Sequence, residues 1–208
     1  MHINQSTDAL LLIDLQPDFM PGGALAVTDG DQILPAVHQL AEKFQHVILT
    51  QDWHPEGHIS FASSHPGAAP FTQIHAPYGA QTLWPDHCLI DSPGAQLHPA
   101  LRIPHVEMIL RKGFRKEIDS YSAFLENDHI TPTGLAGYLH ERGLKRLFIA
   151  GLAYDFCVRY SAEDGTRLSF ECLVLEDACR PVALPHSVDE TNHSFASLDV
   201  RRIATASL

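Results

Sequence analysis

Short apolar runs alternate along this chain with segments in which apolar residues recur at helical spacing. The apolar runs, rich in leucine and β-branched residues, are 9–15, 46–52, 106–113, 146–153 and 170–177, with a final candidate at 201–207. Helical spacing occurs at 31–45, 133–142, 157–169 and 188–199. Buried strands that alternate with helices predict a parallel sheet covered on both faces and joined by right-handed crossovers. We therefore expect a three-layer α/β fold around a central, mostly parallel six-stranded sheet.

Residues 53–105 interrupt this alternation. The segment is rich in proline, glycine, histidine and serine, and it shows no convincing periodic element. An irregular insertion of this length in a compact domain is either disordered or functional. Its aromatic residues are too many for a disordered segment; they are Trp53, Phe61, Phe71, Tyr78 and Trp84. We expect one domain over residues 1–208 with a functional loop insertion at about 53–105.

Composition narrows the class of ligand. With 208 residues, 45% of them apolar, the chain can bury the core of a single domain. A net charge of −11 without a basic run argues against nucleic-acid or anionic-membrane binding and leaves a small molecule as the expected ligand. Nothing in the pattern decides between a monomer and a homodimer.

Several features predict a cytoplasmic protein. The four cysteines form neither a CxxC pair nor a disulfide framework, which is typical of a reducing compartment. The apolar run near the N-terminus lacks the basic flank of a signal peptide and is stopped at Asp14. No apolar stretch approaches the roughly 20 residues that cross a bilayer.

Charged residues end the first three apolar runs. Asp14 lies at the end of the first run, Asp52 at the end of the second and Lys112 at the end of the third, while the turn that carries Cys157 follows the fourth. Ligands of parallel sheets bind at the carboxyl ends of the strands, so these four residues are expected to face one crevice. Burial would raise the pKa of Asp14 toward that of a useful base. The alternatives are a turn-capping Asp14 and an exposed strand-end Lys112.

Cys157 is predicted in the first turn of a helix. Unpaired N–H groups and the positive end of the helix dipole would there favour the thiolate, the nucleophilic form. The alternative is a small buried apolar side chain without a catalytic role.

A second group of polar residues follows Asp52. In the segment 52–58, Asp52, His54 and His58 form a DxHxxxH pattern whose proline and glycine exclude a regular helix. Carboxylate and imidazole ligands suit zinc, iron or manganese, although among 14 histidines such a pattern can also arise by chance. A further ligand could come from His65, His75 or His87, of which His87 in the WPDHC segment is the most constrained.

Seven segments, in order from about residue 8 to about residue 180, resemble the nicotinamidase/pyrazinamidase family of the isochorismatase-like cysteine hydrolases. They are LLLIDLQPDF, QDWHPEGHISFASSH, WPDHC, GAQLHP, RKG, DSYSAF and GLAYDFCV. Pro17, Met20 and Tyr154 depart from the residues common in that family, which are Asn, Cys and Thr.

The resemblance implies a role for each matching residue. Cys157 would be the nucleophile, Asp14 the base and Lys112 the third member of a catalytic triad. The implied ligands of one divalent metal ion, with zinc preferred over iron or manganese, are Asp52, His54, His58 and His87. A cis Leu152–Ala153 bond would direct the Ala153 and Cys157 N–H groups at an oxyanion. The implied lining of the ring pocket is Phe19, Trp84, Tyr121, Leu152 and Phe156.

The activity implied by the resemblance is hydrolysis of nicotinamide to nicotinate and ammonia through a cysteine thioester, with pyrazinamide as a second substrate and NAD salvage as the role. The closest alternative is another superfamily member, an isochorismatase or an N-carbamoyl amide hydrolase, which lacks the metal set. A non-catalytic binding protein on this scaffold would be expected to lack Asp14, Lys112 or Cys157, and none is missing.

Overall fold

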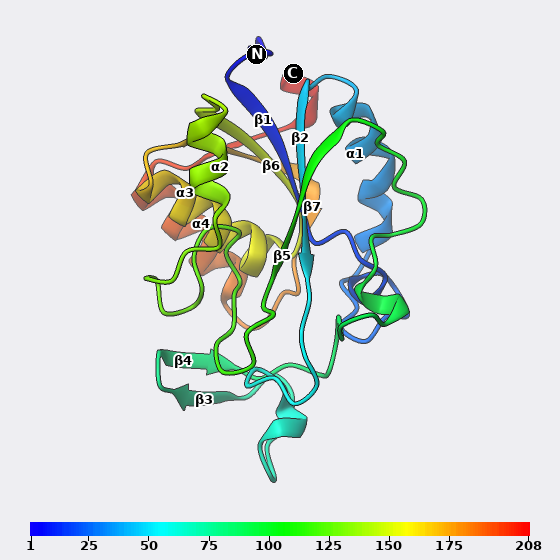
Figure 1. Ribbon diagram of the computed structural model, residues 1–208, viewed down its shortest axis with the longest axis vertical. Coiled ribbons are helices and arrows are strands. Elements are labelled where there is room, and N and C mark those ends of the chain that lie inside the picture. The colour runs from blue at the N-terminus through cyan, green and yellow to red at the C-terminus, as the bar shows by residue number, and fades with distance from the viewer.

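A single six-stranded sheet forms the centre of the molecule (Figure 1). The computed structural model describes residues 1–208. The strands are β1 (Asp8–Ile13), β2 (His46–Asp52), β5 (Val106–Lys112), β6 (Arg146–Leu152), β7 (Glu171–Arg180) and β8 (Arg201–Ile203), in the spatial order β5-β2-β1-β6-β7-β8. All five pairings between them are parallel, so the predicted three-layer α/β fold is confirmed.

The central strand β1 shows why the apolar runs are continuous. Leu10 and Leu12 pack into one core cluster, whereas Ala9, Leu11 and Ile13 pack into another on the opposite face. Both faces of the strand are covered, so every position is apolar.

Helices cover the two faces unequally. The helices α2 (Leu135–Glu141), α3 (Arg159–Arg167) and α4 (Ser187–Leu198) lie on one face, and α1 (Leu34–Ala41) lies on the other (Figure 1). The predicted helix at 31–45 is shorter than expected. A 3-10 turn occupies Gly30–Ile33, and α1 starts at Leu34 because Pro35 is tolerated only in the first turn of a helix. No helix has the length and apolar character needed to cross a bilayer.

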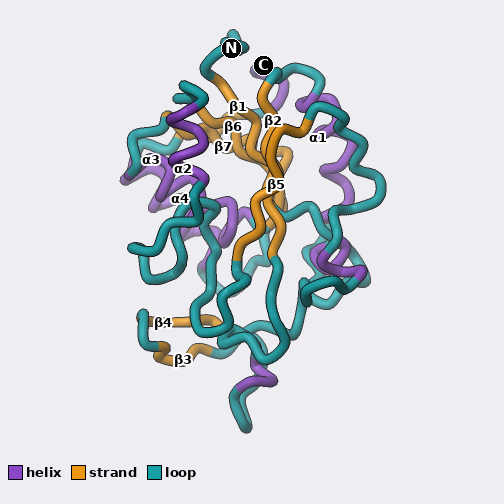
Figure 2. The backbone as a smooth tube through the Cα atoms, in the orientation of Figure 1, coloured by secondary structure: helices purple, strands orange, loops and turns teal.

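The insertion contains more regular structure than its sequence indicated. Strands β3 (Gln73–Ala76) and β4 (Gly79–Thr82) form an antiparallel hairpin, and short 3-10 turns occur at Ala62–Ser64 and Pro93–Ala95. The expectation of no regular element was therefore wrong here. Each strand has four largely uncovered residues, too few for an alternation of apolar and polar positions to stand out. Figure 2 shows loops at the end of the molecule to which β2 and β5 lead.

Candidate active site

The carboxyl ends of the strands bring four buried polar side chains together. The ammonium of Lys112, at the end of β5, is 1% exposed and lies 2.8 Å from Asp14 Oδ2 and 2.5 Å from Asp52 Oδ1. The same Nζ lies 3.3 Å from Cys157 Sγ and donates to the carbonyl of Ser120 at 3.1 Å. One cation thus contacts two carboxylates and a thiol, the convergence that the strand ends predicted.

Asp14 is held by the neighbouring strand β2. The Thr50 hydroxyl donates to Asp14 Oδ1 at 2.5 Å and accepts from the Asp14 N–H at 3.1 Å, while the Asp14 backbone has a left-handed φ of 48°. Burial raises the pKa of the Asp14 carboxyl above its usual value, although the Lys112 ammonium opposes this. A carboxylate with a raised pKa and an ordered position is suited to accept a proton.

Cys157 lies in a π turn, Tyr154–Val158, and not in the first turn of an α-helix, because α3 begins only at Arg159. Burial raises the pKa of the Cys157 thiol well above its usual value, with Lys112 opposing the change and Asp14 adding to it. The expectation that a helix terminus would favour the thiolate is therefore wrong, because removal of the sulfur from water outweighs the favourable charges. The resting group is a thiol that needs a base.

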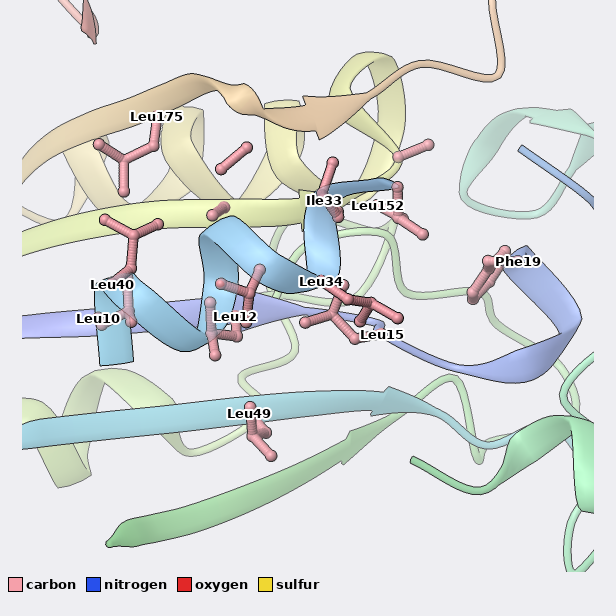
Figure 3. Packing of buried hydrophobic residues seen from close by; sticks show 14 of the residues in the cluster. Leu10, Leu12, Leu15, Phe19, Ile33, Leu34, Leu40, Leu49, Leu152 and Leu175 are labelled. Carbon is pink, nitrogen blue, oxygen red and sulfur yellow. The ribbon is translucent and has the colours of Figure 1, made fainter. Parts of the chain in front are cut away.

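The peptide bond between Leu152 and Ala153 is cis. The Ala153 carbonyl accepts from the N–H groups of Phe156 and Val158, each at 3.1 Å, whereas the Ala153 N–H donates to no protein acceptor. The Leu152 side chain does not line the cavity beside Cys157, contrary to expectation. It is buried in the core cluster with Ile33 and Leu34 (Figure 3), because it belongs to a strand whose alternate side chains face that layer.

Asp52, His54 and His87 form a second group whose free ligand atoms converge. Asp52 Oδ2 lies 3.5 Å from His54 Nε2 and 3.6 Å from His87 Nε2. The Nδ1 atoms donate to the carbonyls of Gly113 and Pro85, both at 2.8 Å, so in neutral rings the Nε2 lone pairs face the carboxylate. Two imidazole nitrogens and a carboxylate oxygen at this spacing fit a divalent cation such as zinc.

Gly113 is required beside this group. It follows β5 with a positive φ of 67°, and a Cβ there would overlap the His54 ring.

The structure does not bring His58 into the same group. Its Nε2 lies 3.1 Å from the carbonyl of Arg115 and 3.2 Å from that of Ile118, and its Nδ1 lies 2.7 Å from Ser60 Oγ. Burial and the neighbouring His54 lower the pKa of His58 to about 4, so the ring is neutral and its single proton serves the carbonyls. His58 instead groups with His54 and Asp119.

The other two histidines considered as ligands also lie outside the group. His65 hydrogen-bonds the Ile59 carbonyl at 2.7 Å, and His75 is an exposed residue of the β3–β4 hairpin.

A cavity joins the two groups. Its lining residues are Phe19, Leu25, Asp52, His54, Trp84, His87, Asp119, Tyr121, Ala153, Phe156, Cys157 and Val182. Four of the expected pocket residues are present, namely Phe19, Trp84, Tyr121 and Phe156. Leu25, Asp119 and Val182 were missed; Asp119 opens the DSYSAF segment, from which only Tyr121 had been selected.

Three of the cavity's aromatic side chains form one wall. The ring centroids of Trp84 and Phe156 are 4.8 Å apart, and those of Tyr121 and Phe156 are 5.5 Å apart. The Trp84 indole N–H donates to the Tyr121 hydroxyl at 3.1 Å, and Gln81 in the hairpin donates to the same oxygen at 2.9 Å. The rings meet edge to face, at interplanar angles of 88° for Trp84 and Phe156 and 72° for Tyr121 and Phe156, and together give the cavity an apolar aromatic side.

Nearly the whole length of the chain is similar to proteins of one known family. The isochorismatase domain matches residues 8–204. The chain belongs to the isochorismatase family. This isochorismatase-family chain is 46% identical over 200 residues to the nicotinamidase of Acinetobacter baylyi, with 96% of this chain and 94% of that protein covered.

Two solved structures extend the comparison. An Acinetobacter baumanii nicotinamidase/pyrazinamidase has a TM-score of 0.96 and 48% identity, with 97% of this chain and 98% of that chain covered. The pyrazinamidase of Pyrococcus horikoshii, solved in complex with zinc, has a TM-score of 0.76 and 32% identity, with 95% and 98% covered.

Proposed function

We propose that this protein is a nicotinamidase that hydrolyses nicotinamide to nicotinate and ammonia and also accepts pyrazinamide. The observation that carries the proposal is the contact of one buried ammonium, Lys112, with Asp14, Cys157 and Asp52. The same Asp52 forms a group of possible metal ligands with His54 and His87, and this group lines a cavity that also has aromatic side chains. The relatives named nicotinamidases and pyrazinamidases support the same reaction class.

The first half of the reaction transfers the acyl group to sulfur. Asp14 accepts the proton of the Cys157 thiol as the sulfur attacks the carboxamide carbon. The N–H groups of Ala153 and Cys157 would donate to the oxyanion that forms, an effect worth about 3 kcal/mol for each donor. Asp14 returns the proton to the nitrogen, the C–N bond breaks and ammonia leaves.

The second half hydrolyses the thioester. Asp14 takes a proton from water, the oxygen attacks the acyl carbon, and the C–S bond breaks as Asp14 returns that proton to the departing sulfur. The thiol is restored, and the acid product gives up its remaining proton to solvent as nicotinate. Lys112 remains an ammonium throughout. Burial alone would lower the pKa of Lys112, but Asp14 and Asp52 raise it well above its usual value.

Asp52, His54 and His87 would hold one divalent ion, and the zinc complex of the Pyrococcus relative makes zinc the first choice. When bound, the ion supplies a coordination position for the pyridine nitrogen of the substrate. Asp52 directs Oδ1 to Lys112 and Oδ2 to the two imidazoles, so it connects the ring-orienting group with the triad. Orientation of this kind accelerates attack by holding the amide carbon near sulfur. His58 as a further ligand stays a prediction.

The test is release of ammonia from three compounds by the purified protein: nicotinamide, pyrazinamide and an N-carbamoyl amine. We expect turnover of the two ring amides and none of the carbamoyl compound. Cys172 is a buried cysteine in β7 that does not line the cavity. Cys172→Ala is therefore the control for substitution of Cys157, and it should remain active. Preferred turnover of the carbamoyl compound would replace this proposal by the alternative amidohydrolase.

A further inference from the structure

Asp18 joins two loops that enter the site from distant parts of the sequence. It lies in the 3-10 turn Pro17–Phe19, immediately before the cavity residue Phe19. Its Oδ2 accepts from the Cys88 N–H at 2.6 Å, and Cys88 immediately follows His87. The rings of Phe19 and His87 meet edge to face with centroids 5.5 Å apart. The other carboxylate oxygen, Oδ1, accepts from the Ala24 N–H at 3.5 Å. The Asp18–Cys88 bond thus joins the residue before Phe19 to the residue after His87, and the rings of Phe19 and His87 are in contact.

Cys88 requires such an anchor. Its φ is 47°, a left-handed conformation that is uncommon for residues other than glycine, asparagine and aspartate. Its N–H is held by Asp18, and its carbonyl accepts from the His54 N–H at 2.9 Å. The His54 carbonyl in turn accepts from Ile90 at 2.9 Å. The backbone at Cys88 is therefore fixed on one side by a carboxylate and on the other by the segment that carries His54.

Gly94 confines the carboxylate from the other side. A Cβ at this position would overlap Oδ1, Cγ and Oδ2 of Asp18. Gly94 does not have a positive φ, so the requirement for glycine here is one of space and not of backbone conformation. Asp18 therefore cannot keep its bond to Cys88 if residue 94 carries a side chain.

We propose that Asp18 is a positioning residue of the metal site, which acts by holding the His87–Cys88 turn so that His87 Nε2 faces Asp52 and His54. This inference rests on the metal site of the proposed function. Asp18 is not a ligand, since it contacts the backbone beside His87 and not the imidazole. Loss of its carboxylate lets the turn relax, which moves one of three ligands away from the other two.

The first measurement is the zinc affinity of the refolded or chelator-stripped protein, determined by competition with a chromophoric chelator. We expect Asp18→Ala to weaken zinc binding by about 10- to 100-fold, the range typical when the support of a metal ligand is removed. Asp18→Asn should recover much of this loss, because its amide oxygen can still accept from Cys88. Asp31→Ala removes an exposed carboxylate with the same change in charge, and this variant should bind zinc as the unsubstituted protein does.

Gly94→Ala tests the same contact without altering Asp18. It should weaken zinc binding in the unsubstituted protein but have little further effect in Asp18→Ala, where the carboxylate that it would displace is gone. Such non-additivity is expected only of residues that act through a shared contact. A merely structural loop contact would lower thermal stability and leave zinc affinity in the folded protein unchanged.

The outcomes separate the two proposals. Zinc affinity within twofold of the unsubstituted protein in Asp18→Ala or in Gly94→Ala, or an equal effect of Gly94→Ala in both backgrounds, would overturn the positioning role while the metal site stands. Should Asp18→Ala fail to fold, Gly94→Ala alone decides. Absence of zinc binding in the unsubstituted protein would instead overturn the metal assignment itself and this inference with it.

Discussion

The active site has two halves that are built in different ways. Of the triad residues, Asp14 directly follows β1, Lys112 ends β5 and Cys157 lies in the turn after β6. Lys112 is also the direct neighbour of Asp52 in the β2–β5 register. The other half, with His54 and His87, comes from the irregular insertion, whose segments are joined by isolated contacts such as the bridge between His54 and Leu89. The bond-making groups thus lie at the ends of hydrogen-bonded parallel strands or in the turn after β6, while the groups that would orient the substrate depend on loop contacts.

Asp52 is where the two halves meet. It is the last residue of β2, and its two carboxylate oxygens face Lys112 on one side and the imidazoles on the other. Burial alone would raise the pKa of Asp52, but Lys112 and His54 lower it well below its usual value, so it remains a carboxylate. We expect substitutions in the sheet half to affect the chemical step and substitutions in the insertion half to affect metal and substrate binding.

The largest effect is expected in the sheet half. Cys157→Ala removes the attacking atom, so ammonia release should fall by at least about 10⁴-fold, as for other nucleophiles that act in a triad. Zinc binding should be unchanged, because Asp52, His54 and His87 are untouched. Measurement of kcat together with zinc stoichiometry checks both parts. Residual activity within tenfold of the unsubstituted protein would contradict the assigned nucleophile.

In the insertion half, His87→Ala should act mainly on binding. Loss of one of three convergent donors should lower zinc affinity by at least about 100-fold, given that loss of mere supporting contacts costs about 10- to 100-fold. KM for nicotinamide should rise more than kcat falls at saturating substrate, because the triad keeps its contacts. His75→Ala, an exposed histidine of the hairpin, is the matched control. If kcat alone falls and KM is unchanged, the division between the two halves is wrong.

The two halves also differ in what could be predicted from sequence. Asp14, Asp52 and Lys112 could be placed together because buried strands are easily recognised and parallel strands end at one edge. Leu25, Asp119 and Val182 could not, since they reach the cavity through loops whose path has no periodic signal. The DxHxxxH spacing treats His54 and His58 alike, and only the three-dimensional course of residues 113–118 shows that the His58 ring is bonded to carbonyls.

The fold shows the same difference. The continuous apolar run of β1 predicted its strand correctly, whereas the β3–β4 hairpin escaped because its strands are short and poorly covered. The direction of the Cys157 pKa was also mispredicted. A helix terminus can be recognised in a sequence, but the burial that dominates this thiol depends on segments brought together by folding.

The pH dependence of turnover tests the sheet half alone. Asp14 must be a carboxylate to accept the thiol proton, and its pKa is raised by burial above the usual 3.8. As the pH falls through this raised pKa, Asp14 becomes protonated and kcat/KM should drop by about tenfold per pH unit. The acid limb should therefore lie above pH 3.8, as measured with metal kept saturating at every pH. A flat profile down to pH 3.8 would contradict the role of Asp14.

The smallest effect is expected from Thr50→Val, which removes the β2 hydroxyl that donates to the Asp14 carboxylate. The Thr50 hydroxyl lowers the pKa of Asp14 by donating to its carboxylate, so its removal should raise that pKa further and move the acid limb of kcat/KM to higher pH. The Asp14 N–H also loses its acceptor, at a cost of about 1–3 kcal/mol in the free energy of unfolding. Thr191→Val, a buried threonine whose hydroxyl donates within α4, should lose stability without moving the limb. An unshifted limb in Thr50→Val would mean that burial, Lys112 and Asp52 set the proton affinity of Asp14 without the Thr50 hydroxyl.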